Sequence, residues 1–134
     1  MKMENIISTH QLTRTFGKFT AVDAITFSVK EGEIFGFLGA NGAGKTTALK
    51  ILTGLLSPSS GSATVAGFDV KKQPEQIKRR IGYMSQKFSL YEDLTVRENI
   101  RLYGGIYGLK MSEIKSKTTV LLEKLQITEE ADKL

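Results

Sequence analysis

Apolar and polar residues alternate along the first thirty positions of the chain, a pattern typical of half-buried strands. Residues 6–13 alternate loosely, and residues 21–29 alternate more regularly. Residues 33–38 (EIFGFL) are almost entirely apolar after the first position, which predicts a short buried strand. Between these segments, Glu31-Gly32 predicts a turn. Residues 63–66 predict a further short strand.

The spacing of apolar residues then changes to a helical period. Residues 46–56 predict a helix whose apolar face is formed by Leu49, Ile51, Leu52, Leu55 and Leu56. Thr95 and Glu98 match a capping box, which predicts a helix that begins there and carries Ile100 and Tyr103. Ser112 is expected to open another helix. Helices therefore dominate the chain after about residue 94.

One glycine-rich segment lies between the predicted strand 33–38 and the predicted helix 46–56. It reads Gly39-Ala40-Asn41-Gly42-Ala43-Gly44-Lys45-Thr46 and fits the Walker A pattern of Gly, any four residues, Gly, Lys and then Ser or Thr. A strand, a glycine loop and a helix, in this order, are the context that the motif requires. A plain glycine-rich turn would explain the glycines but not the Lys45-Thr46 pair. The segment predicts a phosphate-binding loop.

The chemistry of this loop follows from its residue types. Three glycines let the backbone turn its N–H groups inward, and the helix that starts near Lys45 adds its positive N-terminal end. We expect Lys45 to contact the β- and γ-phosphates and the Thr46 hydroxyl to hold the Mg²⁺ that bridges them. The predicted ligand is a nucleoside triphosphate with Mg²⁺. The loop does not identify the base.

Composition narrows the class of protein. The 134 residues suffice for one modest domain, and the absence of cysteine excludes disulfides and thiolate metal sites. His10, the one histidine, lies between polar neighbours and is expected to be a solvated surface residue. No stretch has signal-peptide character or approaches the roughly 20 apolar residues that span a bilayer, so we expect a soluble cytoplasmic protein.

The net charge of +5 includes a basic cluster at residues 71–80, which is one possible mark of a nucleic-acid site. Pro74 and Glu75 interrupt the cluster and resemble the start of a short helix. We therefore expect a solvated helix face and no nucleic-acid partner.

Further motifs surround the loop. Phe16-Gly17 precedes it, and Gln86 and residues 91–99 (YEDLTVREN) follow it. In this order and spacing, the chain resembles the N-terminal half of an ABC-transporter ATP-binding subunit. The sequence of residues 31–47 is most similar to that of the drug-exporter branch. The resemblance implies an α/β P-loop NTPase fold of the ABC ATPase type. Such a fold has a three-layer core, an N-terminal antiparallel β portion and the start of a helical subdomain.

The resemblance also implies roles for individual residues. ATP would be bound by residues Gly39 to Thr47, with Phe16, which lies 29 residues before Lys45, stacking on adenine. Gln86 matches the Q-loop glutamine, whose amide contacts Mg²⁺ and the attacking water. The ATP-binding core would cover residues 1–86, and the first part of the helical subdomain would cover residues 87–134.

The family resemblance implies two protein partners. One is a second ATP-binding subunit, arranged head to tail. The other is a polytopic membrane subunit, whose coupling helix would dock near Lys87, Phe88, Leu90 and Tyr91 and would place the protein on the inner face of the cell membrane. Loop residues that simply cover the core would give a similar pattern there.

Several family motifs are missing from the chain. The signature motif, the Asp-Glu strand and the switch histidine do not occur, and residues 120–123 fit an amphipathic helix better than the acidic strand. We therefore expect a front part of the domain that binds nucleotide weakly, if at all, and turns it over negligibly. The alternatives are an ABC-type module acting on ribosomes or DNA, and a stand-alone P-loop kinase or GTPase. The sequence lacks the Asn-Lys-x-Asp motif by which GTPases recognise guanine, so the GTPase alternative has no support from that motif.

Overall fold

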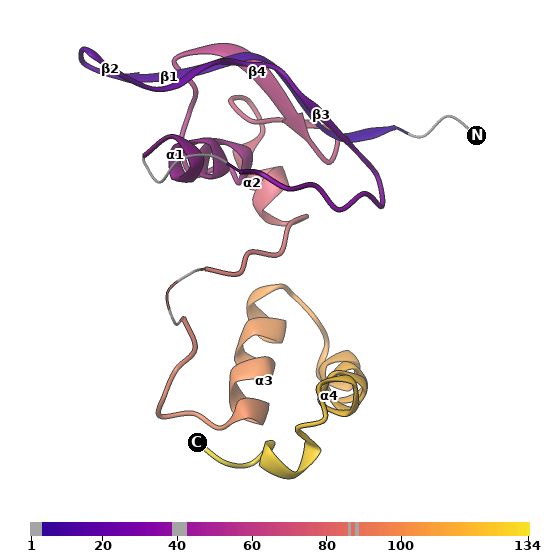
Figure 1. Cartoon of the computed structure of the whole chain (residues 1–134). Helices are drawn as coiled ribbons and strands as arrows, with labels where there is room; N and C mark the ends of the chain where they lie inside the picture. Colours follow the sequence, from indigo (N-terminus) through magenta and orange to yellow (C-terminus); the bar gives the residue numbers. More distant parts are fainter. Residues whose placement is uncertain (1–3, 39–42, 86, 88) are drawn as a thin grey trace. The chain divides into compact units, whose positions relative to one another are not determined.

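The computed structural model describes residues 4–38, 43–85, 87 and 89–134. The chain divides into two compact units, Met1–Gly82 and Tyr83–Leu134. Figure 1 labels the main strands and helices of both units.

The first unit contains an antiparallel sheet. Its strands are β1 (Asn5–Phe16), β2 (Phe19–Ile25), β3 (Ser28–Lys30), β4 (Ser60–Val65) and β5 (Phe68–Asp69). Along the sheet the order is β2-β1-β4-β5, and β3 also pairs with β1. Every pairing is antiparallel. This sheet confirms the predicted antiparallel β portion.

The strand predicted over residues 21–29 is interrupted. It forms as β2 and β3, separated by Thr26 and Phe27. Ala24 has a φ of 45°, a left-handed conformation that regular strands do not adopt, and it lies at the register shift between the Arg14–Val22 and Leu12–Ile25 pairs. The ladder with β1 ends at Ile25. The buried Thr9 hydroxyl satisfies the backbone at the break, accepting from the Phe27 N–H (3.0 Å) and donating to the Ile25 carbonyl (3.1 Å).

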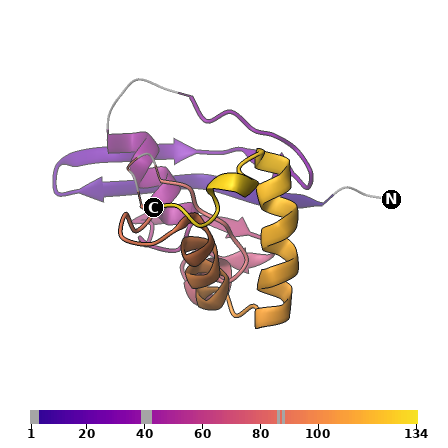
Figure 2. The same ribbon diagram turned by 90° about the horizontal axis from the view of Figure 1, so that it is seen from below.

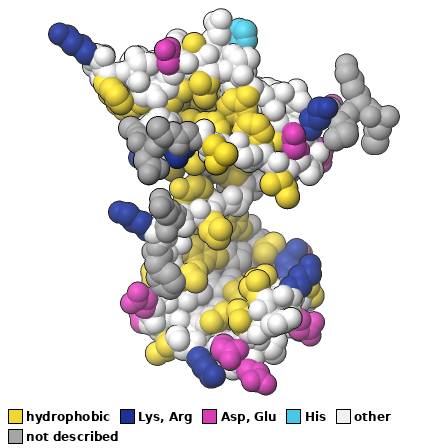
Figure 3. All heavy atoms as spheres, in the orientation of Figure 1, with side chains coloured by type: hydrophobic (Ala, Val, Ile, Leu, Met, Phe, Trp, Pro, Cys, Tyr) yellow, Lys and Arg dark blue, Asp and Glu magenta, His cyan; other side chains and the backbone are white. Residues whose placement is uncertain are grey.

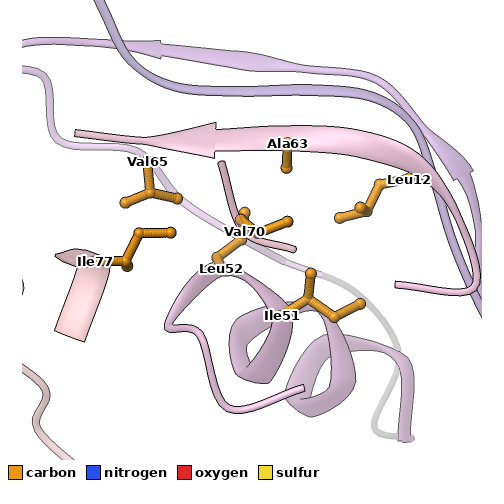
Figure 4. Packing of buried hydrophobic residues seen from close by; sticks show 7 residues of the cluster. All are labelled: Leu12, Ile51, Leu52, Ala63, Val65, Val70 and Ile77. Atoms are coloured by element: carbon orange, nitrogen blue, oxygen red, sulfur yellow. The ribbon is translucent and has the colours of Figure 1, made fainter. Parts of the chain in front are cut away.

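Two helices, α1 (Ala43–Leu52) and α2 (Pro74–Lys78), pack with this sheet to form the core. Seven side chains meet between the helices and the strands (Figure 4): Leu12, Ile51, Leu52, Ala63, Val65, Val70 and Ile77. The short helix expected at Pro74 is confirmed. The apolar face predicted for residues 46–56 is only partly right, because α1 ends at Leu52 and leaves Leu49 and Leu55 exposed.

The buried strand predicted over residues 33–38 does not form. No strand among the described residues pairs with its backbone, so no ladder can define it. Phe35 and Phe37 contact Phe27, with ring centroids 5.3 and 5.7 Å away, whereas the alternate positions Ile34 and Leu38 are almost wholly exposed. One face of this apolar segment is therefore partly packed against Phe27, with Phe35 still 43% exposed, and the other is open.

The second unit is helical, as expected. It contains α3 (Val96–Ile106), α4 (Met111–Leu125) and a 3-10 helix over Thr128–Glu130. The predicted capping box is confirmed: the Thr95 hydroxyl accepts from the Glu98 N–H (3.2 Å), and the Thr95 N–H donates to the Glu98 carboxylate (2.8 Å). The second helix starts at Met111, one residue before the predicted Ser112.

The two long helices pack closely in this unit. A Cβ on Gly104 of α3 would lie 2.8 Å from the Ile114 side chain of α4, so the glycine permits the contact. The chain after α4 turns back to the start of α3 (Figures 1 and 2), where the Arg97 N–H donates to the Ala131 carbonyl (2.9 Å). That bond satisfies one of the N–H groups that a helix start leaves without an internal partner.

Candidate nucleotide site

The described part of the glycine-rich loop is its junction with α1. Residues 39–42 lie outside the described residues, and α1 begins at Ala43, so Gly44, Lys45 and Thr46 form its first turn. The N–H groups of a first turn have no intrahelical partners, and the helix dipole makes this end positive. The first turn carries no acidic residue that would oppose an anion. This end of α1 is chemically suited to phosphate.

The first turn of α1 lies against strand β2. A Cβ on Gly44 would fall 2.6 Å from the Ala21 carbonyl oxygen, a distance that real Cβ atoms do not reach. Only glycine therefore fits at position 44. The close approach joins the first turn of α1 to the β1–β2 hairpin.

The opposite side of α1 anchors the helix in the core. Thr47, Ala48 and Ile51 are buried, whereas Thr46 is exposed and Lys45 is half-buried. Because the buried face fixes the rotation of the helix, Lys45 and Thr46 are held away from the core. In the Walker A motif, the hydroxyl directly after the lysine is the oxygen ligand of a phosphate-bound Mg²⁺, and an exposed Thr46 hydroxyl fits this role. These residues fit a Mg²⁺–triphosphate ligand.

Phe16 is the last residue of β1, at the tip of the hairpin. It pairs with Phe19 across the Gly17-Lys18 turn, where Gly17 takes the positive φ (59°) that a tight turn needs. Phe16 is 45% exposed, so its ring is accessible to a flat ligand. The sequence prediction that this ring can stack on a base is compatible with its position.

Arg14 is a residue of this site that the sequence analysis did not identify. Its guanidinium carbon lies 4.7 Å from the centre of the Phe16 ring, within the range of a cation–π interaction. Its Nη1 also donates to the Ser57 carbonyl at 2.8 Å. The sequence could have predicted this contact, because residues two apart on a strand, such as Arg14 and Phe16, share a face.

The predicted docking residues lie partly in the described chain. Gln86 and Phe88 lie outside the described residues, and Lys87 is exposed. Leu90 and Tyr91 line an apolar groove of about 770 Å³ in the second unit, together with Ile100, Tyr103, Tyr107 and other side chains of the helices. This groove is wide enough to receive apolar side chains of another protein segment.

Asn99 of α3, also missed from the sequence, holds the loop that forms the edge of this groove. It is buried (5% exposed), and its Oδ1 accepts from the Tyr91 N–H at 2.9 Å. Its Nδ2 donates to the carbonyls of Tyr91, Leu94 and Thr95. The Tyr103 hydroxyl adds a bond to the Ser89 carbonyl (2.7 Å). Residues 89–95 are thus fastened to α3.

The basic segment at residues 71–80 is partly neutralised. Lys78 pairs with Glu75 at 2.9 Å, and the Asp69 carboxylate accepts the N–H groups of Lys71 and Lys72. The N–H of Lys72 is the largest cause that lowers the pKa of Asp69 below its ordinary value. Ile77, on the inner side of α2, is fully buried. The described geometry is that of a solvated helix face.

Among residues 4–38, 43–85, 87 and 89–134, no helix is both long and apolar enough to cross a bilayer. The same part of the chain holds no cluster of three or more His, Cys, Asp or Glu side chains suited to a metal ion.

Comparison with known proteins places these features in context. Residues 22–134 match the family described as ABC transporter. The chain is 51% identical over 107 residues to the probable multidrug ABC transporter ATP-binding protein YbhF of Escherichia coli, covering 80% of this chain and 18% of that protein. It is 39% identical over 126 residues to the linearmycin resistance ATP-binding protein LnrL of Bacillus subtilis, covering 94% of this chain and 40% of that protein.

A solved structure agrees with the sequence relatives. A protein described as the ATP-binding subunit of an ABC transporter superposes with a TM-score of 0.82 at 29% identity, covering 95% of this chain and 53% of the other. The present chain therefore spans less than half the length of the two sequence relatives and about half of the solved one.

Proposed function

The chain belongs to the ABC transporter family, and from this premise we propose that it is the ATP-binding part of an exporter that binds Mg-ATP and works with a separate membrane subunit. The observation that carries the proposal is the first turn of α1, where Gly44 fits against Ala21 and presents Lys45 and Thr46. Members of this family are ATPases. Export is favoured because the relatives' names refer to multidrug transport and linearmycin resistance.

In this proposal, the chain's own residues bind and orient the triphosphate. The backbone N–H groups at the start of α1, with the rest of the Gly39–Thr47 segment, surround the phosphates, and Lys45 neutralises charge on their terminal oxygens. The Thr46 hydroxyl and the Gln86 amide would hold Mg²⁺, which supplies charge neutralisation when bound. Phe16 supplies a flat surface for the adenine ring.

Two protein partners complete the proposal. A second ATP-binding subunit would lie head to tail with this one. A polytopic membrane subunit would dock at Lys87, Phe88, Leu90 and Tyr91, where the last two residues line the groove of the second unit. That docking would hold the protein on the inner face of the cell membrane. The ATP-binding core would extend over residues 1–86, with the helical subdomain following.

These 134 residues contain no signature motif and no Asp-Glu pair at the end of a strand. Phosphoryl transfer depends on positioned charges and an oriented water, so the residues present support binding more than turnover. We expect negligible ATP hydrolysis by this chain. Steady hydrolysis that disappears in Lys45→Ala would contradict this expectation.

Photolabelling tests the proposed base site. With Mg²⁺, 8-azido-ATP should label the β1–β2 hairpin that contains Phe16, and excess ATP should suppress the label. Peptide mass spectrometry locates the labelled residues. Label confined to other segments, or label that ATP does not suppress, would contradict the placement of the base on Phe16.

A further inference from the structure

Arg14 and Phe16 project from the same face of β1, two positions apart. The guanidinium lies over the ring, 4.7 Å from its centre, and its Nη1 donates to the Ser57 carbonyl at 2.8 Å. The Arg14 Nε is buried and has no hydrogen-bond partner among the described residues. The guanidinium is therefore held between an aromatic ring and a backbone carbonyl.

The carbonyl that Arg14 contacts belongs to a segment that is hydrogen-bonded to β1. This segment, residues 57–59, follows α1 and is tied back to β1 by three bonds. The Ser59 N–H donates to the Thr13 carbonyl (2.8 Å), and the Ser59 hydroxyl accepts from the Thr15 N–H (3.0 Å) and from the Thr15 hydroxyl (3.3 Å). Since α1 carries Lys45 at its other end, these contacts fix the Phe16 ring relative to the phosphate-binding helix.

The covered ring retains an accessible surface. Phe16 is still 45% exposed although the guanidinium lies against it. A cation on an aromatic ring is attracted by the ring quadrupole, and base–aromatic stacking is sequence-tolerant because every base has a π surface. Larger bases gain more from a rigid platform, because they cover more of it.

We infer that Arg14 is a positioning and specificity-determining residue of the nucleotide site: it backs the Phe16 ring so that the exposed surface of the ring accepts a purine in preference to a pyrimidine. The inference rests on the proposed function, in which Phe16 receives the base. It adds the residue that prepares the platform and through which the preference for a purine is set. A cation–π contact at a partly exposed site predicts an effect on affinity of about 2- to 5-fold.

The experiment compares three ligands on the 134-residue chain by ¹⁵N NMR titration, which measures millimolar dissociation constants. The ligands are Mg-ATP, Mg-CTP and Mg-tripolyphosphate, the last of which has no base. Arg14→Met, which removes the charge and keeps a long apolar stem, should raise the Kd for ATP about 2- to 5-fold. It should narrow the preference for ATP over CTP and leave tripolyphosphate binding unchanged.

Two further variants separate the outcomes. Arg14→Lys keeps the positive charge without the planar guanidinium, so it should lose less affinity for ATP than Arg14→Met does. It also provides a second test of Arg14 if the methionine variant does not fold. Phe16→Ala should bring the Kd for ATP close to that for tripolyphosphate.

Each contrary result has a distinct meaning. Unchanged ATP affinity in both Arg14 variants, with a loss in Phe16→Ala, overturns the role of Arg14 and leaves the base site intact. Equal weakening of all three ligands by Arg14→Met shows a purely structural residue and also overturns it. If Phe16→Ala leaves ATP binding unchanged, or if the unmodified chain binds neither ATP nor tripolyphosphate, the proposed function itself fails.

Discussion

Gly44 and Ala21 approach each other so closely that a Cβ on Gly44 would lie 2.6 Å from the Ala21 carbonyl oxygen. This contact joins the first turn of α1 to the β1–β2 hairpin, and so it connects the end of the helix where we propose that phosphate binds with the strand pair that carries Phe16. The Ala21 carbonyl and the Gly44 Cα both belong to the backbone, so neither can make room for a Cβ without displacing a backbone segment. Residue 44 is therefore restricted to glycine by packing as well as by the motif.

Gly44→Ala should destabilise the first unit by about 1–3 kcal/mol, the usual range for an added group in a packed site. The gain of about 1 kcal/mol that alanine brings to a helix interior would not offset the clash fully. Chemical denaturation, followed by the amide signals of the first unit, measures the change.

The matched control for this substitution is Gly105→Ala in α3. A Cβ at Gly105 would meet nothing within 4 Å, so alanine there should stabilise the second unit by about 0.5–1 kcal/mol. Stabilisation of similar size at both positions would show that the Gly44–Ala21 contact does not restrict residue 44.

Asn99→Ala should loosen the loop at residues 89–95. The substitution removes the Asn99 side-chain amide, which bonds the Tyr91 N–H and the carbonyls of Tyr91, Leu94 and Thr95. Each lost hydrogen bond is worth about 0.5–1.5 kcal/mol. We expect a total loss of about 2–3 kcal/mol in the second unit and faster hydrogen exchange at the Tyr91 amide. Arg101→Ala, on the exposed side of the same helix, should change stability by less than about 0.5 kcal/mol. Unchanged exchange at Tyr91 in Asn99→Ala would contradict the role of the amide.

Thr95→Ala removes one half of the capping box of α3 and should cost about 1 kcal/mol. The Thr95 backbone N–H is the largest cause that lowers the pKa of Glu98 below its ordinary value, and the Thr95 side chain is the second. A lowered carboxyl pKa means that its stabilising contribution is present above pH 4.5 and is lost as the pH falls through the lowered value. NMR titration of Glu98 should show its pKa rising only part of the way toward its ordinary value in Thr95→Ala, because alanine keeps the backbone N–H and removes only the side-chain contribution. A pKa that does not respond would contradict the capping geometry.

The sequence predicted best those features that depend on a few neighbouring residues. The Thr95–Glu98 capping box and the helix start at Pro74 are local, and both are confirmed. The strand over residues 33–38 was predicted wrongly because a strand also needs a partner for its backbone, which apolar composition does not reveal. The irregular register at Ala24 likewise depends on a backbone angle that the alternating pattern does not encode.

The candidate site was predictable to the same extent. Lys45 and Thr46 were identified from a motif whose chemistry is carried by its own residues, and Phe16 was identified from its position relative to that motif. Arg14 and Asn99 were missed because their roles depend on partners in space: a ring on the same strand face for Arg14, and a loop folded back on α3 for Asn99. Hydrophobic side chains exposed on each unit (Figure 3) show the same limit of pattern reading, since periodicity predicts which residues are apolar but not which are covered.

Equilibrium dialysis with labelled ATP and Mg²⁺ tests the central claim, that the first turn of α1 binds the triphosphate. Lys45→Ala should weaken binding at least about 10-fold, because it removes a charge-assisted contact worth about 1.5–3 kcal/mol. Lys50→Ala, which removes the same charge from the last turn of the same helix, should leave the affinity within about 2-fold, since a solvated charge at that end contributes little. Equal affinities for the unmodified chain, Lys45→Ala and Lys50→Ala would contradict the account.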